Sequence, residues 1–134
     1  MLPFEFIIEG PPVSQQTRRR AKLREWKRKI REHAESQWPP EEFPHMEQLI
    51  IKITYFYDEV SMDVDNIPKP ISDALNGLVY FDDEQLTDNY TRKRNLNDEL
   101  IIENPSTVLA SGLSLETEFL YIIIDEAPNQ QVID

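Results

Sequence analysis

The chain has 134 residues, a formal net charge of -11 and no cysteine. This length predicts one domain over residues 1–134, and the absence of cysteine excludes a disulfide framework or a thiolate metal site and fits a cytoplasmic, reducing compartment. No apolar run reaches the roughly 18 residues of a transmembrane helix, and the N-terminus has no basic start, so we expect neither a membrane span nor a signal peptide.

The first predicted elements are a short strand and a long helix. Residues 4–9, FEFIIE, are aromatic and β-branched, and the Gly-Pro-Pro sequence that follows ends this strand because proline has no amide donor. Over residues 17–37, apolar side chains recur at three- and four-residue steps, which predicts a helix that a Pro-Pro pair terminates. Its apolar stripe consists of Leu23, Trp26, Ile30 and Ala34.

This predicted helix carries most of the positive charge. Residues 18–31 hold nine of the 14 Lys and Arg residues and one acid, Glu25, although the whole chain is strongly acidic. Such a run can be the solvated face of a surface helix, but its imbalance favours a surface that faces phosphates. A second basic group lies at residues 92–94. The residues predicted to contact nucleic acid are Arg18, Arg19, Arg20, Lys27, Arg28, Arg92 and Arg94.

The rest of the chain predicts further strands and one short helix. Residues 48–57 are apolar on both faces of a strand pattern, which predicts a central strand. Residues 67–77 keep helical spacing and include a glycine suited to a C-terminal cap. The other expected segments are strands over residues 86–95, 99–103 and 115–125, and a frayed tail from Ala127.

Carboxylates flank the short helix on both sides. Asp63 and Asp65 are two residues apart, which places both side chains on one side of an extended backbone, and Asp82 and Asp83 follow the helix. A short helix with tight connections can fold back so that the two pairs meet. Clustered carboxylates repel one another unless a cation neutralises them, and an all-oxygen site is what Mg²⁺ or Mn²⁺ prefers.

One lysine lies between the two aspartate pairs. Lys69 follows Asp65 by four residues, where its ammonium group could contact a phosphate oxygen or the charge that develops during phosphoryl chemistry. Asp73 follows Lys69 by four residues, so the two could equally form a surface ion pair. The aspartates also have plain structural interpretations, because Asp65 could serve as a helix N-cap and Asp82-Asp83 as a turn.

The order of these groups is more specific than any one of them. The segments concerned are Asp63-Val64-Asp65-Asn66, Lys69, Asp73-Ala74-Leu75, Gly77-Leu78-Val79 and Asp82-Asp83-Glu84-Gln85. This order resembles the RusA-type Holliday junction resolvases. A second matching piece is the first strand with the Pro-Pro-Val-Ser turn at residues 11–14.

The resemblance implies a small α+β domain with a mixed β-sheet and two main helices. It further implies a homodimer that cuts four-way DNA junctions by paired symmetric nicks in recombination and repair, with a Mg²⁺-activated water attacking the phosphodiester. The metal-binding catalytic aspartates of the family correspond to Asp63, Asp65 and Asp83, and its essential lysine corresponds to Lys69. The strong acidity departs from the family pattern, and residues 99–134 match it poorly.

Three other interpretations remain open. The chain could bind branched or single-stranded nucleic acid without cutting it. It could be another Mg²⁺ enzyme, such as a phosphatase with an Asp-x-Asp motif, although that motif usually follows an apolar strand directly, whereas Ser61 and Met62 precede Asp63. It could also be a protein–protein adaptor with an acidic surface, in which case the order of aspartates and lysine would be a coincidence.

Overall fold

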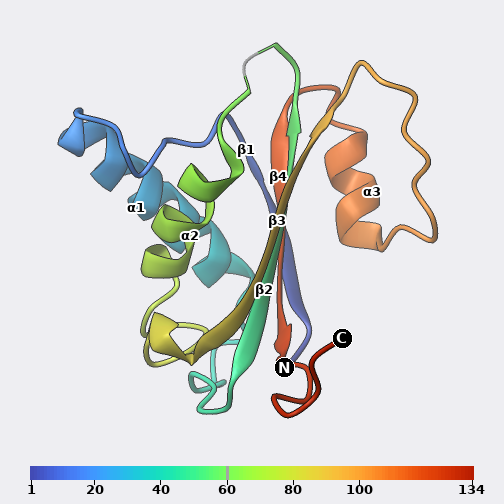
Figure 1. The fold of residues 1–134 in the computed structure, drawn as a ribbon. Helices are drawn as coiled ribbons and strands as arrows, with labels where there is room; N and C mark the ends of the chain where they lie inside the picture. Colours follow the sequence, from blue (N-terminus) through green and yellow to red (C-terminus); the bar gives the residue numbers. More distant parts are fainter. Residues whose placement is uncertain (60) are drawn as a thin grey trace.

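The computed structural model describes residues 1–59 and 61–134, which form one α+β domain around a four-stranded mixed sheet (Figure 1). Helices α1 and α2 lie on one side of the sheet and α3 lies on the other (Figure 1). In chain order the elements are β1 (Phe4–Glu9), α1 (Arg20–Gln37), β2 (Leu49–Tyr57), the 3-10 turn η1 (Val64–Asn66), α2 (Pro68–Ala74), the 3-10 turn η2 (Asp83–Gln85), β3 (Leu86–Asn95), α3 (Thr107–Leu113) and β4 (Phe119–Glu126).

The strand order confirms the predicted mixed sheet. Its order is β1-β4-β2-β3, with β4 antiparallel to both β1 and β2, and with β3 parallel to β2. Strand β2 therefore pairs on both sides, as its two apolar faces predict. Strand β3 is an edge strand, and its side chains are exposed or half-buried.

The main core lies between the sheet and the helices α1 and α2. The four buried residues of α1 are the four of the predicted stripe, Leu23, Trp26, Ile30 and Ala34. Three of them belong to one buried cluster that also contains Ile51 and Ile53 of β2 and Ile71 of α2. Fully burying one such side chain contributes roughly 1.5–3 kcal/mol, so this core fixes α1 and α2 against one face of the sheet.

A smaller apolar contact holds α3 on the opposite face. Phe56 of β2 and Phe119 of β4 stack with ring centroids 4.7 Å apart, and both are buried. Gly112 of α3 lies against the Phe119 ring so closely that a Cβ atom would overlap it. The absence of a side chain at this position allows the helix to approach the sheet.

The C-terminal third differs from its predicted structure. Residues 99–103 form no strand, and Ile101 is 89% exposed. Residues 107–113 form the unpredicted helix α3, which Ser106 caps by accepting a hydrogen bond from the Leu109 amide at 3.1 Å. The predicted strand at residues 115–125 begins later, at Phe119. The prediction of a strand at 99–103 was wrong because an apolar pair flanked by acids specifies no partner strand.

The two predicted helices are shorter than expected. Helix α1 begins at Arg20, because the hydroxyl groups of Ser14 and Thr17 accept backbone hydrogen bonds from Gln16 and Arg19 within the preceding turns. Helix α2 ends at Ala74, and the chain turns back through Gly77, whose φ of +79° is readily available only to glycine. Across the described residues, no helix is both long and apolar enough to cross a membrane.

Candidate active site

Two contacts hold the segment that carries Asp63 and Asp65. The backbone turns at η1, where the Asp63 carbonyl accepts a hydrogen bond from the Asn66 amide at 3.0 Å. The Asn66 carbonyl in turn accepts a hydrogen bond from the Gln15 amide at 3.2 Å, which ties this turn to the segment before α1. From the edge strand, Lys93 Nζ donates to the Met62 carbonyl at 3.0 Å.

Helix α2 is fixed at both ends by buried hydrogen bonds and by α1. The hydroxyl of Tyr80, which is fully buried, donates to the Ser72 carbonyl at 2.6 Å, and the Ser72 hydroxyl donates to the Pro68 carbonyl at 3.0 Å. At the end of α2, the Arg31 guanidinium of α1 donates to the Asn76 carbonyl at 2.5 Å. The bond from Tyr80 satisfies a carbonyl in the last turn of α2, where the helix itself leaves the carbonyl groups without a partner.

The two acids of the Asp82-Asp83 pair have different partners: Asp82 caps a turn and Asp83 pairs with Lys69. Asp82 Oδ1 accepts a hydrogen bond from the Glu84 amide at 3.1 Å, which caps η2. Gln85 accepts hydrogen bonds from the Phe81 and Asp82 amides and donates to two backbone carbonyls of the loop before β2. Because Asp82 is used as a cap, Asp83 is the member of the pair that reaches the helix.

Lys69 connects the two sides of the site. Its Nζ lies 2.8 Å from Asp83 Oδ2 and 2.9 Å from Asp73 Oδ1, so the contact across the fold and the ion pair within α2 are both present. The other oxygen of Asp73 lies 3.2 Å from Lys27 Nζ of α1. These four residues of alternating charge form what we call the ion-pair chain: Lys27, Asp73, Lys69 and Asp83.

Hydrogen bonding between Lys69 and its partners keeps Lys69 and Asp83 ionised. The hydrogen bond from Lys69 holds the pKa of Asp83 below its ordinary value. The hydrogen bonds to Asp83 and Asp73 raise the pKa of Lys69 above its ordinary value. Lys69 is therefore an ammonium ion and Asp83 a carboxylate at neutral pH.

The remaining two aspartates stand apart from this network. Asp63 and Asp65 are exposed, and neither side chain makes a hydrogen bond or an ion pair with any described residue. Within residues 1–59 and 61–134, no group of three or more His, Cys, Asp or Glu side chains is arranged to hold a metal ion. Asp83 therefore approaches Lys69, but among the described residues it forms no cluster of three acids with Asp63 and Asp65.

The chemistry of these donors nevertheless suits a hard divalent cation. Asp63, Asp65 and Asp83 offer oxygen ligands only, which is the set that Mg²⁺ and Mn²⁺ prefer. In the protein alone, carboxylates repel one another, and Asp83 takes Lys69 as its counter-ion. The free carboxylates on η1 and the paired one on η2 are the residues that could hold such an ion.

A cavity of about 410 Å³ adjoins the Asp63 segment, and sequence reasoning missed it. Its walls include Pro12 and Ser14 of the turn after β1, Lys22 of α1 and Met62, the residue before Asp63. The Pro-Pro-Val-Ser motif at residues 11–14 predicts the turn that forms one wall of this cavity. The position of Lys22 across from it depends on the packing of α1, which the motif does not encode.

The predicted nucleic-acid contacts on α1 fall into two groups. Arg28 pairs with Glu25 and Glu32, and Arg20 donates to the carbonyls of Gln15 and Thr17. Lys27 belongs to the ion-pair chain through its contact with Asp73. In contrast, Arg18 and Arg19 are exposed, and their side chains contact no described residue through a hydrogen bond or an ion pair.

Arg92 and Arg94 lie on the other face of the sheet. Strand register pairs Arg92 with Thr54 and Arg94 with Phe56, whereas β2 residues of the opposite parity face α1 and α2. Arg92 Nε donates to Thr54 Oγ1 at 2.8 Å. The predicted set of nucleic-acid contacts is therefore divided between two faces of the molecule.

Comparison with known proteins matches most of the chain to one family model. The model described as endodeoxyribonuclease RusA covers residues 10–103. A search of curated proteins finds no match. The matched range contains all four residues predicted to be catalytic, and it ends before α3 and β4.

Proposed function

The chain belongs to the RusA endodeoxyribonuclease family, whose members are implied to cut Holliday junctions, and on this premise we propose that it resolves four-way DNA junctions by Mg²⁺-dependent hydrolysis. The observation that carries the proposal is the contact of 2.8 Å between Lys69 and Asp83, which joins two parts of the family motif across the fold. The exposed carboxylates of Asp63 and Asp65, at the turn before α2, would be the other two metal-binding acids beside Asp83.

Each residue has a distinct role in this proposal. Asp63, Asp65 and Asp83 would hold one or two Mg²⁺ ions, with Mn²⁺ as a substitute. When bound, the ion would supply a Lewis acid that activates water for attack on the phosphodiester and stabilises the leaving oxygen. The repulsion among three carboxylates explains why they would meet only around a cation.

Lys69 would act on the phosphate, and Asp73 would position it. If Asp83 turns toward a metal ion, Lys69 keeps its ion pair with Asp73 at 2.9 Å, and Asp73 keeps Lys27 at 3.2 Å. The ammonium group then stays near the site while one of its partners is withdrawn. A cation held in this way offsets the negative charge that develops on the phosphate during hydrolysis.

The proposal includes a homodimer and roles in DNA recombination and repair. A two-fold axis relating two sites would match the pseudo-two-fold symmetry of a four-way junction and allow paired symmetric nicks. Arg18 and Arg19, whose side chains make no hydrogen bond or ion pair with any described residue, would contribute phosphate contacts at the entry of α1. Because these contacts neutralise phosphates, we expect junction binding to weaken as salt rises, with a slope set by their number.

The test is cleavage of a synthetic mobile four-way junction by the purified full chain. We expect paired nicks in Mg²⁺, none in EDTA and none on a linear duplex of the same sequence. Analytical ultracentrifugation of the protein alone would report the dimer. Binding of the junction without cutting in either Mg²⁺ or Mn²⁺ would overturn the proposal in favour of a non-catalytic binder of branched DNA.

A further inference from the structure

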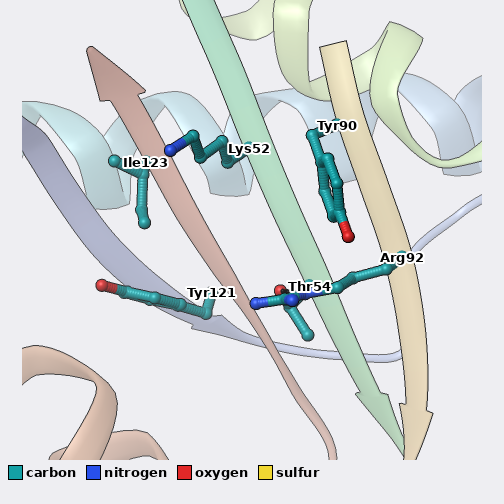
Figure 2. Close-up of a pocket in the computed structure, with 6 residues that line it drawn as sticks. All are labelled: Lys52, Thr54, Tyr90, Arg92, Tyr121 and Ile123. Atoms are coloured by element: carbon teal, nitrogen blue, oxygen red, sulfur yellow. Dashed lines mark hydrogen bonds between the residues drawn. The ribbon is translucent and has the colours of Figure 1, made fainter. Parts of the chain in front are cut away.

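A second concave site lies on the side of the sheet away from α1 and α2. A pocket of about 190 Å³ opens there over β2, beyond the area that α3 covers. Figure 2 shows its side chains projecting from three neighbouring strands and surrounding a hollow. The lining residues are Lys52, Thr54, Tyr90, Arg92, Tyr121 and Ile123.

The strand register explains why these side chains converge. In the β2–β3 pair, Lys52 lies opposite Tyr90, and Thr54 lies opposite Arg92. In the β2–β4 pair, Lys52 lies opposite Ile123, and Thr54 lies opposite Tyr121. Paired residues share one face of a sheet, so this part of the pocket is built into the backbone and needs no loop to form it.

The pocket is positively charged in a strongly acidic protein. Lys52 and Arg92 contribute two cations, and the described lining includes no carboxylate. Arg92 is oriented by its hydrogen bond to Thr54 at 2.8 Å and lies over the Tyr90 ring at 5.5 Å from its centroid. Three acids lie around the lining on the same face. Glu5 accepts a hydrogen bond from the Tyr121 hydroxyl at 3.3 Å, and Asp88 and Asp125 each lie two residues along their strand from Tyr90 and Ile123 respectively.

The walls offer flat apolar surfaces beside these cations. Tyr90 is 53% exposed on the edge strand, and Ile123 and the Tyr121 ring form the opposite wall. A cation pair next to an exposed aromatic ring fits a phosphate joined to a planar base, since each base can stack on an aromatic side chain. A second copy of the same pocket fits poorly, because two cationic pockets repel each other.

We propose that this pocket binds one nucleotide unit of a single DNA strand, with a phosphate between Lys52 and Arg92 and the base stacked on Tyr90. The choice of DNA rests on the proposed function. The site itself lies on the other face of the sheet from the aspartates and takes no part in hydrolysis. It would hold an unpaired segment or a second arm of a branched substrate while the first face acts.

The test is a titration of the ¹⁵N-labelled full chain with a single-stranded oligothymidylate, followed through its amide spectrum. We expect the amides of Thr54, Arg92 and Tyr121 to shift, and their concentration dependence gives an affinity for this site alone. Tyr90→Ala should weaken that affinity about tenfold, because it removes one base–aromatic stack. Phe43→Ala is the matched control, since Phe43 is another exposed aromatic residue, lies outside the pocket and should leave the affinity unchanged.

Charge and fold are checked in the same experiment. Lys52→Gln should weaken binding about threefold and flatten its dependence on salt by roughly one phosphate contact. Lys52 and Tyr90 are exposed, and a wild-type-like amide spectrum outside the pocket shows that each variant folds. Thymidine and inorganic phosphate are titrated separately, and each alone should bind more weakly than the oligonucleotide.

Three results would overturn the proposal. Shifts confined to α1 and α2 would place the strand on the other face, and junction cleavage could still proceed. A response to inorganic phosphate as strong as that to the oligonucleotide would show an anion site rather than a strand site. Shifts of the pocket amides with protein concentration alone would assign this face to self-association. Conversely, pocket shifts in a protein that cuts no junction would support this site and contradict the proposed function.

Discussion

On the face of the sheet that α1 and α2 cover, cations and carboxylates are joined into a network, whereas on the other face Lys52 and Arg92 line a pocket without a carboxylate among its described lining residues. The first face keeps a lysine charged and held between two acids. The second presents cations whose charge no neighbouring carboxylate in that pocket cancels. The same sheet thus offers one surface suited to chemistry on a phosphate and another suited to binding one.

The two faces also differ in how they are assembled. The residues of the first face come from α1, α2 and the turns at η1 and η2, which the core and backbone hydrogen bonds bring together. Those of the pocket come directly from the register of three strands. A substitution on the first face should therefore affect catalysis, and a substitution in the pocket should affect binding. The following predictions test this division.

The largest expected effect is the loss of cleavage in Asp65→Asn. This change removes a carboxylate charge from the exposed turn η1 with little change in shape, so we expect junction cutting to fall at least about a hundredfold while junction binding remains. The measurement is the rate of nicking under single-turnover conditions, beside a gel-shift titration in Ca²⁺.

Asp98→Asn serves as the matched control for this prediction. Asp98 is exposed, lies within the range that matches the family and is not part of the candidate site. It should cut at the wild-type rate. Normal cutting by Asp65→Asn would show that the catalytic acids lie elsewhere and would remove the chemical role from this face.

A stability prediction concerns the contact that covers part of the second face. Gly112→Ala places a methyl group against the Phe119 ring, and overpacking of this kind costs about 1–3 kcal/mol of the free energy of unfolding. Urea unfolding followed by tryptophan fluorescence measures it. Ser111→Ala, on the exposed side of the same helix, should change stability by only a few tenths of a kcal/mol.

An unchanged free energy of unfolding in Gly112→Ala would mean that α3 moves away from the sheet at little cost. In that case the second face would be open over its whole length. The pocket would then be part of a larger surface, and the contrast between a covered and an uncovered part of this face would not hold.

Sequence patterns predicted the first face better than the second. The four-residue step from Lys69 to Asp73 and the stripe of α1 depend on local helix geometry, and both are present as expected. The contact between Lys27 and Asp73 joins residues 46 apart, and no local pattern predicts it. Helix α3 contains threonine, valine and glycine, which are weak helix formers, so its helical state depends on the Ser106 cap and on packing against Phe119.

The division of the predicted nucleic-acid contacts could not be seen from composition. Strand alternation places Arg92 and Arg94 on one face of β3, but β2 is apolar on both sides, so its pattern does not tell which face the helices cover. Similarly, the excess of bases in α1 hides the fact that Arg28 is paired with two acids. Which acid a basic residue pairs with, and which face of the sheet it lies on, are properties of the tertiary structure.

A smaller effect is expected for single basic residues near α1. Arg19→Gln removes a cation that contacts no described acid, and junction affinity should fall about threefold with a salt slope smaller by roughly 0.9. Arg28→Gln should change the slope less, because Arg28 already pairs with Glu25 and Glu32. Fluorescence anisotropy over a range of salt concentrations measures both. Equal slopes for the two variants would mean that DNA breaks the internal pairs of Arg28.

The smallest expected effect is the pH dependence that Lys69 confers on stability. Lys69 holds the pKa of Asp83 below its ordinary value, so the pair contributes stability above the unfolded-state pKa of the acid and loses it as the pH falls through the lower, folded-state value. Since Lys69 is 53% exposed, solvent screens this contribution, which should be well under ~1 kcal/mol. Urea unfolding of the wild type and Lys69→Met should therefore differ slightly at neutral pH and converge in acid. Lys52→Met, which removes an exposed lysine from the pocket without carboxylates, should show no such convergence, and a difference for Lys69→Met that persists in acid would mean that packing rather than charge accounts for it.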